Sequence, residues 1–329
     1  MSRASRARAI AQAAAVGGAG LVGAGGAFYG LLIGQARLAR HRIGTPSVSP
    51  PNPDARYGDG DGEALRLAVL GDSGAAGFGV ETATETTGAL VAAGLAAALG
   101  KPVDLRSVAV VGALSGDLQA QVDTVVPWQP HVAVVMVGAN DVTHKVTPGR
   151  SVALLASAVQ SLLAANAAVV VGTCPDLGTV RPIPHPLRLV ARRWSRSLAA
   201  AQTVAVLQAG GRTVALADLL GAEFDAHPDR MFGPDQFHPS PAGYRAVADA
   251  LVPSLHAALV DATPDGDEAP TPVRTSVRPE TVLAVDVAAA AAAEVGGTEV
   301  AIAAASDQPA RRWGQRTLAA VLRRRDDTD

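Results

Sequence analysis

This chain of 329 residues has one cysteine, few aromatic residues and a small net charge. The one cysteine, Cys174, excludes an internal disulfide and any metal site built from several cysteines. A formal net charge of −2 offers no electrostatic basis for nucleic acid as the main partner. Aromatic residues make up 3% of the chain and hydrophobic residues 48%, so the core must consist mainly of valine, leucine and alanine.

Charged residues are absent between Arg8 and Arg37, a stretch longer than the roughly 20 residues that cross a bilayer. Arginines precede this stretch, as in the basic start of a signal or signal-anchor segment. We therefore predict that residues 1–42 form a transmembrane helix that anchors the chain in the cell membrane. The alternative is a buried core helix rich in alanine and glycine. Glycines at spacing four would let two such helices pack as a dimer: Gly26, Gly30 and Gly34.

A linker and a folded domain follow. Residues 43–64 are rich in proline, glycine and aspartate and have no periodicity, which indicates a linker. From residue 65 onward, short apolar runs alternate with longer stretches of helical period. The runs are 65–70, 103–111, 132–137, 167–172 and 213–218, and the helical stretches are 87–99, 114–126, 150–165, 187–208 and a last one from Ser240. For residues 65–260 this alternation predicts an α/β fold, a three-layer α/β/α sandwich around a parallel sheet of about five strands.

The character of the chain changes again after residue 260. Residues 261–329 are acidic and proline-rich at first and then of low complexity, which is typical of a disordered tail. Acidic residues inside the alanine-rich part argue against a second membrane span. The arginine-rich end has the pattern of a basic amphipathic helix, which either touches an anionic membrane surface or is a solvated charged tail.

Residues suited to chemistry stand where the predicted strands end. Ser73 follows the first apolar run in the sequence Gly-Asp-Ser, and Gly112 and Asn140 follow the second and third runs. Asp235 and His238 stand just before the last helix. Because function collects at the carboxyl ends of the strands in an open parallel sheet, we expect these five residues to lie together.

These residue types meet the needs of nucleophilic catalysis. A serine hydroxyl becomes a useful nucleophile when an imidazole removes its proton, and a carboxylate on the other ring nitrogen fixes the tautomer. Ser73, His238 and Asp235 are therefore the candidate nucleophile, base and orienting acid. The backbone N–H groups of Ser73 and Gly112 and the side-chain amide of Asn140 are candidate donors to an oxyanion. Taken alone, Ser73 and Gly112 also fit ordinary turns.

Four segments in this order resemble the four blocks of the SGNH, or GDSL-type, esterase and lipase family: Gly-Asp-Ser with Ser73, the glycine block with Gly112, Gly-Ala-Asn-Asp with Asn140, and Asp-Gln-Phe-His-Pro with Asp235 and His238. The resemblance covers about residues 65–260. It implies a flavodoxin-like hydrolase fold and ester hydrolysis through an acyl-serine intermediate, without a metal or organic cofactor. One departure is the stretch after the serine, residues 74–76, which is Gly-Ala-Ala instead of a leucine and its usual neighbours, and it leaves the substrate preference open.

The resemblance and the predicted anchor together suggest a substrate class. We expect an acyl ester of a lipid or of an acylated envelope glycan, met by a domain outside the cytoplasm. The proline- and arginine-rich residues 174–197 are predicted to form one wall of the substrate cleft, and the rival interpretation is a surface excursion. The candidate lining residues are Asp176, Arg181, Leu187 and Trp194.

Other functions fit parts of the sequence. An acyltransferase of the same fold is a close variant, because an acyl-serine can pass its acyl group to an alcohol other than water. A nucleotide- or flavin-binding glycine loop at residues 71–79 lacks the Gly-x-Gly-x-x-Gly and Gly-Lys-Ser/Thr patterns and leaves Asp235 and His238 unexplained. A non-catalytic, membrane-tethered binding module is the third alternative.

Overall fold

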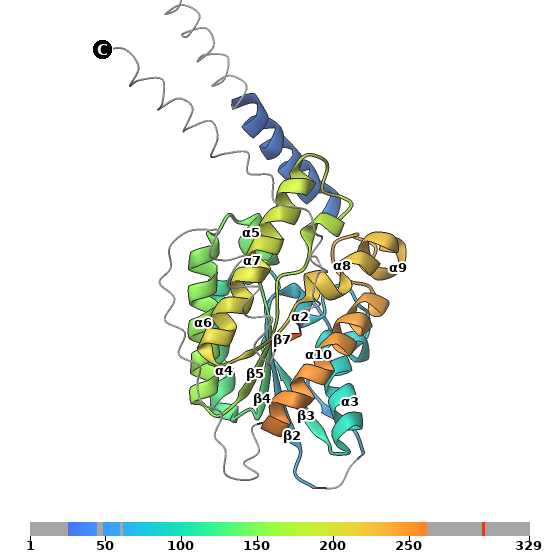
Figure 1. Cartoon of the computed structure of the whole chain (residues 1–329). Coiled ribbons are helices and arrows are strands. Elements are labelled where there is room, and N and C mark those ends of the chain that lie inside the picture. Colours follow the sequence, from blue (N-terminus) through green and yellow to red (C-terminus); the bar gives the residue numbers. More distant parts are fainter. Residues whose placement is uncertain (1–25, 45–48, 60–61, 262–297, 300–329) are drawn as a thin grey trace, which may run out of the picture.

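The structure is a computed structural model that describes residues 26–44, 49–59, 62–261 and 298–299 (Figure 1). Its centre is a seven-stranded sheet in the order β1-β3-β2-β4-β5-β6-β7. All neighbouring strands pair in parallel except β1 and β3, which are antiparallel. The strands are β1 (Arg56–Tyr57), β2 (Leu65–Gly71), β3 (Val103–Ser107), β4 (Val132–Met136), β5 (Ala168–Gly172), β6 (Arg212–Val214) and β7 (Thr298–Glu299).

The prediction of a parallel sheet of about five strands was therefore wrong at both edges. β1 lies in the predicted linker and β7 in the predicted tail, and each has two residues. Such short strands leave no periodicity to detect in a sequence. β1 is held by an ion pair between Arg56 and Asp104 of β3, with Nε and Oδ1 2.8 Å apart.

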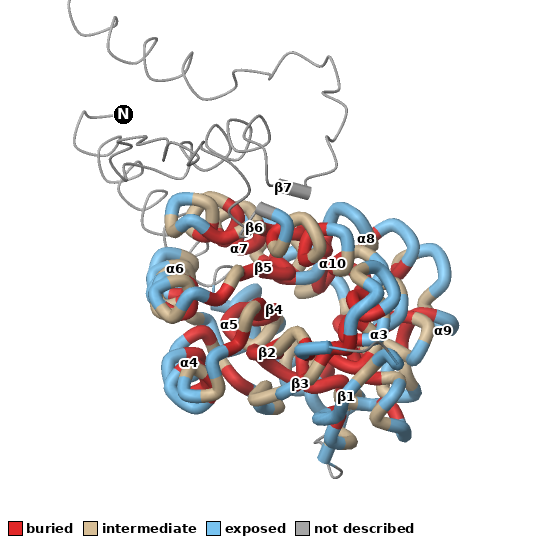
Figure 2. The backbone as a smooth tube through the Cα atoms, turned by 90° about the horizontal axis from the view of Figure 1, so that it is seen from below, coloured by how far each residue is buried: buried red, intermediate tan, exposed pale blue. Residues whose placement is uncertain are grey.

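Helices cover both faces of this sheet, as the sequence predicted (Figures 1 and 2). α3 (Thr87–Leu99) and α10 (Pro241–Asp261) pack on one face, and α4 (Leu118–Val125), α6 (Pro148–Ala164) and α7 (Leu187–Ala209) on the other. Further helices are α2 (Ser73–Ala76), α5 (Ala139–Thr143), α8 (Leu216–Ala226) and α9 (Pro228–Met231), and single turns of 3-10 helix are η1 (Ala83–Glu85), η2 (Ser115–Asp117), η3 (Val126–Trp128) and η4 (Leu177–Thr179).

The two layers of core follow from the alternation of side chains along each strand. Leu67 and Val69 of β2 face α3 and α10, whereas Ala68 and Leu70 face α4 and α6. All four side chains are buried, which explains why the central strands appear in the sequence as continuous apolar runs. Figure 2 shows the strands of the sheet between the two helical layers.

Most predicted elements appear close to their expected bounds, and two predicted strands end early. The predicted strand at residues 213–218 ends at Val214, and α8 begins two residues later. The strand predicted at 103–111 also ends early, at Ser107. α10 begins as predicted, because the Ser240 hydroxyl accepts the backbone N–H of Gly243 at 3.2 Å and Pro241 occupies the first helical position.

Helical residues 26–43 lie beside the start of α7 (Figure 1). Ala39 is buried there, and the side chain of Gln35 accepts the backbone N–H of Leu187 at 2.9 Å. Within the described ranges, no helix combines the length and the apolar character that a membrane span requires. Most of the predicted anchor and the basic C-terminal end lie outside the described residues, and the predicted dimer and domain boundaries stay predictions.

Candidate active site

Ser73 is presented by a turn that only glycine permits. β2 ends at Gly71, whose φ of 134° is in the region that favours glycine. A Cβ atom on Gly71 would lie 1.8 Å from the backbone oxygen of Met136 in β4. The Asp72 carboxylate then accepts the backbone N–H of Gly74 at 2.9 Å and so caps α2, of which Ser73 is the first residue. The Gly-Asp-Ser sequence therefore turns the chain sharply and places Ser73 at the carboxyl edge of the sheet.

A buried glutamine holds this turn in place. The side-chain oxygen of Gln121 accepts the N–H of Gly71 at 2.7 Å, and its side-chain nitrogen donates to the carbonyl of Gly71 at 2.9 Å. Gln121 is 4% exposed, so its amide gives the N–H of Gly71 a buried acceptor and gives the carbonyl of Gly71 a second donor besides the N–H of Val110. Sequence analysis missed this residue, because a single glutamine on a predicted helix carries no pattern.

The structure brings Ser73, His238 and Asp235 into one chain of hydrogen bonds. Nε2 of His238 lies 3.0 Å from Oγ of Ser73, although the two residues are 165 positions apart. Nδ1 of His238 lies 2.6 Å from Oδ2 of Asp235. The other Asp235 oxygen accepts the backbone N–H groups of Phe237 and His238, both at 3.0 Å. The Asp-x-x-His spacing thus forms a small turn in which the carboxylate faces the ring.

Hydrogen bonding keeps the Asp235 carboxylate ionised. Burial alone would raise the pKa of Asp235, but the hydrogen bonds from the His238 ring and from two backbone N–H groups outweigh it, so the net pKa is lowered. An ionised carboxylate favours the tautomer in which Nδ1 carries the proton and Nε2 is free to accept one. That is the state in which His238 can take the proton of Ser73.

Aromatic rings hold the imidazole from two sides. The ring of His238 lies 4.5 Å from the ring of Phe78 and 4.8 Å from that of Phe237, measured between centroids. Tyr244 of α10 fixes the Phe78 loop, because its hydroxyl donates to the carbonyl of Phe78 at 2.6 Å. Burial raises the pKa of Tyr244 well above its ordinary value, so this hydroxyl stays a donor. Sequence analysis missed all three aromatic residues, which lie far from Ser73 or appear as ordinary apolar positions.

Gly112 and Asn140 lie in the segments that follow β3 and β4, the two strands that pair with β2. The loop after β3 is tied to the Ser73 turn, since the N–H of Val110 donates to the carbonyl of Gly71 at 3.0 Å. It is tied to α5 as well, since the Asn140 side-chain amide donates to the carbonyl of Ala113 at 3.1 Å. A primary amide has two hydrogens, so one N–H of Asn140 remains after this bond.

The backbone N–H of Gly112 has the features of an oxyanion donor. In the described part of the chain it donates to no acceptor, and no atom lies within 4 Å of where a Cβ of Gly112 would be. Its φ of 85° also favours glycine. The N–H of Ser73 is similar, because the first residue of a helix has no acceptor within that helix. The roles of Ser73, Gly112 and Asn140 in an oxyanion hole stay a prediction.

Asp141 secures the loop that carries Gly112. Its carboxylate is fully buried and accepts the Ser115 hydroxyl at 2.7 Å, and that hydroxyl lies 2.9 Å from the hydroxyl of Ser151. The backbone N–H of Ser115 also donates to this carboxylate, at 3.2 Å. Asp141, the residue after Asn140, therefore fixes the position of the loop after β3.

Burial changes the acidity of a second carboxyl group at the site. Burial raises the pKa of Asp72 to about 6, and the nearby carboxylate of Asp141 also raises it. The hydrogen bond from the N–H of Gly74 and the attraction of His238 lower this pKa but do not outweigh burial. Because the folded-state pKa is above the ordinary value, the folded protein binds this proton more tightly than the unfolded chain. The stability that this group contributes is present below about pH 4 and is lost as the pH rises through about 6.

Replacing Asp72 with asparagine is expected to stabilise the protein at about pH 8 and to change little at about pH 4. Asparagine can still accept the N–H of Gly74, but it carries no buried charge. The shift from 3.8 to about 6 corresponds to at most about 3 kcal/mol in the free energy of unfolding. Urea unfolding at both pH values measures it, with Asp123→Asn at an exposed position of α4 as the control. A difference between Asp72→Asn and wild type that does not depend on pH would contradict this explanation.

A cavity of about 130 Å³ opens beside Ser73 and His238. It lies between the loop after β5, helix α8 and the loop that carries His238, and most of its lining is apolar. The wall residues from these elements include Leu177, Val180, Leu216, Leu220, Phe224, Phe232 and Phe237. Sequence analysis missed the contribution of α8, because residues 213–218 were predicted as a strand.

Of the four predicted cleft residues, the structure places one at this cavity. Asp176 lines it, whereas Arg181, Leu187 and Trp194 are not among the described residues that do. A guanidinium nitrogen of Arg181 instead lies 3.1 Å from Oδ1 of Asp225. Leu187 and Trp194 are partly buried and pack against an apolar cluster that includes Leu198 and Ile183. From this segment, the described cavity lining includes Pro175, Asp176, Leu177, Thr179 and Val180, and the part that the segment plays in a substrate cleft stays a prediction.

Cys174 is fully buried, as expected of a structural thiol. Burial raises the pKa of Cys174 well above its ordinary value, so the thiol stays protonated at neutral pH and is a poor nucleophile. Its backbone N–H donates to the side-chain oxygen of Gln202 at 2.7 Å. Across the ranges that the structure covers, no cluster of three or more histidine, cysteine or acidic side chains could hold a metal ion.

Comparisons with known proteins agree with this site. The profile of the GDSL-like lipase/acylhydrolase family matches residues 69–246, which include Ser73, Gly112, Asn140, Asp235 and His238. The chain is 43% identical over 256 residues to a protein of Mycobacterium tuberculosis named GDSL-like esterase Rv1075c, a match that covers 73% of this chain and 82% of that protein.

Solved structures with similar folds include TesA and an acetylxylan esterase. TesA is 21% identical with a TM-score of 0.49, and the match covers 59% of this chain and 99% of TesA. Axe2, an acetylxylan esterase of Geobacillus stearothermophilus, is 20% identical with a TM-score of 0.46, and the match covers 58% of this chain and 94% of Axe2. On the family profile and the mycobacterial relative, this chain belongs to the GDSL-like lipase/acylhydrolase family and is a carboxylic ester hydrolase.

Proposed function

We propose that this enzyme hydrolyses acyl esters of lipids and that Ser73 forms an acyl-enzyme intermediate. One observation carries the proposal: the hydrogen-bonded series Asp235, His238 and Ser73 ends at an apolar cavity, with Ser73 and His238 in its wall. A nucleophile, a base and space for an apolar group are thereby at one place.

The proposed reaction has two halves. Oγ of Ser73 attacks the ester carbonyl while Nε2 of His238 takes the hydroxyl proton, and the oxyanion lies against N–H donors of Ser73, Gly112 and Asn140. The tetrahedral intermediate expels the alcohol, which leaves with the proton from His238. A water molecule then gives its proton to His238 and attacks the acyl carbonyl, which releases the acid and restores Ser73. Asp235 stays ionised and stabilises the imidazolium in both halves.

The cavity favours an acyl chain longer than acetyl. Its walls are mainly leucine, valine and phenylalanine side chains, which gain little from an acetyl group but remove a longer chain from water. Each buried methylene contributes about 0.8 kcal/mol, so several methylenes in the cavity would raise kcat/KM by orders of magnitude. An acetylated glycan would leave this space unused, so we favour the lipid ester.

A series of nitrophenyl esters from acetate to dodecanoate tests the proposed substrate class. We expect the full-length protein in detergent micelles to show a kcat/KM at least about tenfold higher for octanoate than for acetate, from the apolar cavity. A maximum at acetate would instead favour an acylated glycan. Acyl transfer to an added alcohol that exceeds hydrolysis in water would favour the acyltransferase.

We also propose that the N-terminal residues attach the enzyme to a membrane, with the folded domain outside the cytoplasm. The support is the sequence between Arg8 and Arg37 and the exposure of large apolar side chains on residues 26–43, which are Phe28, Tyr29, Leu31 and Leu38. Fractionation with alkaline carbonate tests attachment. The full chain should stay with the membranes and a chain that lacks residues 1–46 should be released, whereas release of both would contradict attachment.

A further inference from the structure

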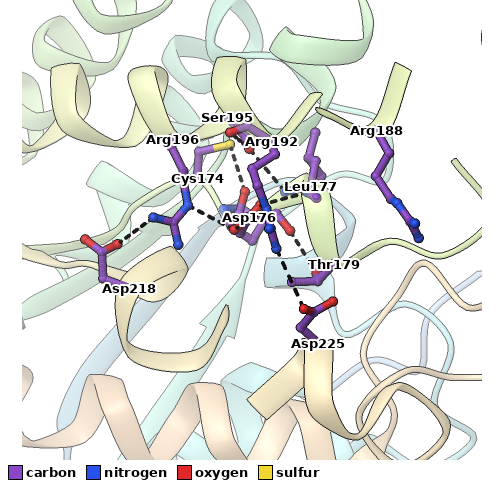
Figure 3. Close-up of polar contacts among 12 residues, drawn as sticks. Cys174, Asp176, Leu177, Thr179, Arg188, Arg192, Ser195, Arg196, Asp218 and Asp225 are labelled. Carbon is purple, nitrogen blue, oxygen red and sulfur yellow. Dashed lines mark hydrogen bonds and ion pairs between the residues drawn. The ribbon is translucent and has the colours of Figure 1, made fainter. Parts of the chain in front are cut away.

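Asp176 is a buried carboxylate at the wall of an apolar cavity. Its side chain is 1% exposed, and two arginines of α7 pair with it. Nε of Arg196 lies 2.9 Å from Oδ2 of Asp176, and Nε of Arg192 lies 3.3 Å from the same oxygen. Figure 3 shows both guanidinium groups converging on Asp176 from α7. We call Asp176, Arg192 and Arg196 the arginine clamp.

The same arginines also reach α8. Arg196 lies 3.6 Å from Asp218, and Arg192 lies 4.0 Å from Asp225, between their nearest charged atoms. Asp218 and Asp225 are seven positions apart, about two helical turns, so they share one face of α8. Figure 3 shows dashed lines that join Arg196 to Asp218 and Arg192 to Asp225.

The clamp therefore contacts, from outside the cavity, the two elements that form two of its walls. Leu177, Thr179 and Val180 of the loop form one wall, and Leu220 and Phe224 of α8 are part of the other. Within the described chain, α7 contributes no side chain to the cavity lining, yet its arginines bind both walls.

The loop is also fastened to α7 by a neutral contact, because the N–H of Leu177 donates to the hydroxyl of Ser195 at 3.1 Å. Within the loop, the N–H of Gly178 donates to Oδ1 of Asp176 at 2.7 Å. A Cβ on Gly178 would lie 2.3 Å from Nε of Arg192. The loop thus lies directly against the guanidinium, and a change at the clamp moves the wall.

A contribution to the stability of the fold is a weak explanation for the presence of a buried ion pair. The desolvation of the charges offsets much of their attraction, and well-packed apolar side chains often serve as well. What an ion pair adds is a fixed geometry, because the fork of an arginine binds a carboxylate in a defined direction. At a cavity that receives part of the substrate, a fixed wall geometry selects which substrate fits.

We propose that the arginine clamp sets the spacing of the two cavity walls and so determines which acyl chain length the enzyme prefers. Asp176 is a positioning residue in this proposal, since it acts through the loop and not on the reacting atoms. The proposal rests on the proposed function, in which the cavity receives the acyl chain.

The substitution Asp176→Asn tests the arginine clamp, because it removes the charge of Asp176 and leaves the size of the side chain almost unchanged. Asparagine can still accept the N–H of Gly178, but it no longer attracts Arg192 and Arg196. We expect kcat/KM for nitrophenyl decanoate to fall about tenfold or more, mainly through KM, because a misplaced wall loses contacts with the chain. For nitrophenyl acetate, which does not reach this wall, we expect a change of less than about twofold.

Asp104→Asn is the matched control. It makes the same chemical change in the Arg56–Asp104 pair at the edge of the sheet, and we expect it to leave the ratio of decanoate to acetate activity unaltered. Equal losses on both esters in Asp176→Asn, or an unchanged ratio, would show that Asp176 serves only folding and would overturn the proposal.

Acetate hydrolysis separates this proposal from the proposed function. Activity that disappears with Ser73→Ala supports the serine mechanism whatever the clamp does. If the wild type hydrolyses no ester, calorimetric binding of decanoate still tests the clamp. We then expect Asp176→Asn to bind decanoate about tenfold more weakly than wild type, and equal affinities or no binding to either would overturn the proposal.

Discussion

Replacing Ser73 with alanine is expected to lower kcat for ester hydrolysis by at least about 10⁴-fold, because it removes the nucleophile that we propose forms the acyl-enzyme. Removing the nucleophile of a serine hydrolase leaves only the assistance that oxyanion donors and substrate binding provide. The nearby thiol of Cys174 cannot replace Ser73, since it is fully buried and burial raises its pKa. The affinity for substrate should change little, because the cavity walls stay in place.

The measurement compares kcat for nitrophenyl octanoate in wild type and Ser73→Ala. Ser157→Ala, at an exposed position of α6, makes the same change away from the site and should keep full activity. Far-ultraviolet circular dichroism shows whether the variants are folded. A folded Ser73→Ala variant that retains more than a few per cent of wild-type kcat would mean that hydrolysis does not pass through Ser73.

Replacing Asp235 with asparagine is expected to cost about 10⁴-fold in kcat, although the change in shape is minimal. The Asp235 carboxylate accepts two backbone N–H groups with one oxygen and faces Nδ1 of His238 with the other. Asparagine can keep its oxygen on the backbone N–H groups only by pointing its NH₂ group at Nδ1. Nδ1 must then accept a hydrogen bond, so the ring proton moves to Nε2, where it blocks transfer from Ser73.

The decisive readout for Asp235→Asn is a loss in kcat without a comparable rise in KM. Asp229→Asn, at an exposed position of α9, is the control for removing one acidic side chain near the same loop. Wild-type kcat in Asp235→Asn would show that His238 does not depend on this carboxylate, and the assignment of Asp235 would be wrong. A raised KM with unchanged kcat would place Asp235 in substrate binding.

Local signals in the sequence identified the candidate reacting groups because each stands next to an element boundary. Ser73 follows a strand that is apolar without interruption, and His238 precedes a helix with a clear capping serine and a proline. The Asp-x-x-His spacing also predicts a contact that needs only one turn of chain. The resemblance to the esterase family added the order of the four segments, and the family profile agrees with it.

The cavity could not be predicted in the same way. Its walls come from the loop after β5, from α8 and from the loop that carries His238, and their packing depends on the tertiary fold. α8 begins inside an apolar run that has the period of neither a helix nor a strand, so it was predicted as part of β6. Arg181, Leu187 and Trp194 are close to Asp176 in sequence, but Arg181 pairs with Asp225 of α8, and Leu187 and Trp194 of α7 pack in an apolar cluster.

Buried polar groups were equally invisible in the sequence. Gln121 satisfies both backbone groups of Gly71, and Gln202 links the N–H of Cys174 to the carbonyl of Val137. Both glutamines lie on helices whose apolar stripe gives no hint of a buried amide. Their partners are backbone atoms at the strand ends, which become neighbours only when the helices pack on the sheet.

The most direct test of the central claim is to identify the residue that carries the acyl group. The protein is mixed with nitrophenyl decanoate, quenched in acid within the first turnover, digested and analysed by mass spectrometry. The account predicts a decanoyl group on the peptide that contains Ser73, and its absence from Ser73→Ala. A decanoyl group on another residue, or rapid hydrolysis by wild type with no decanoyl group on Ser73 and no labelling of Ser73 by a fluorophosphonate, would contradict it.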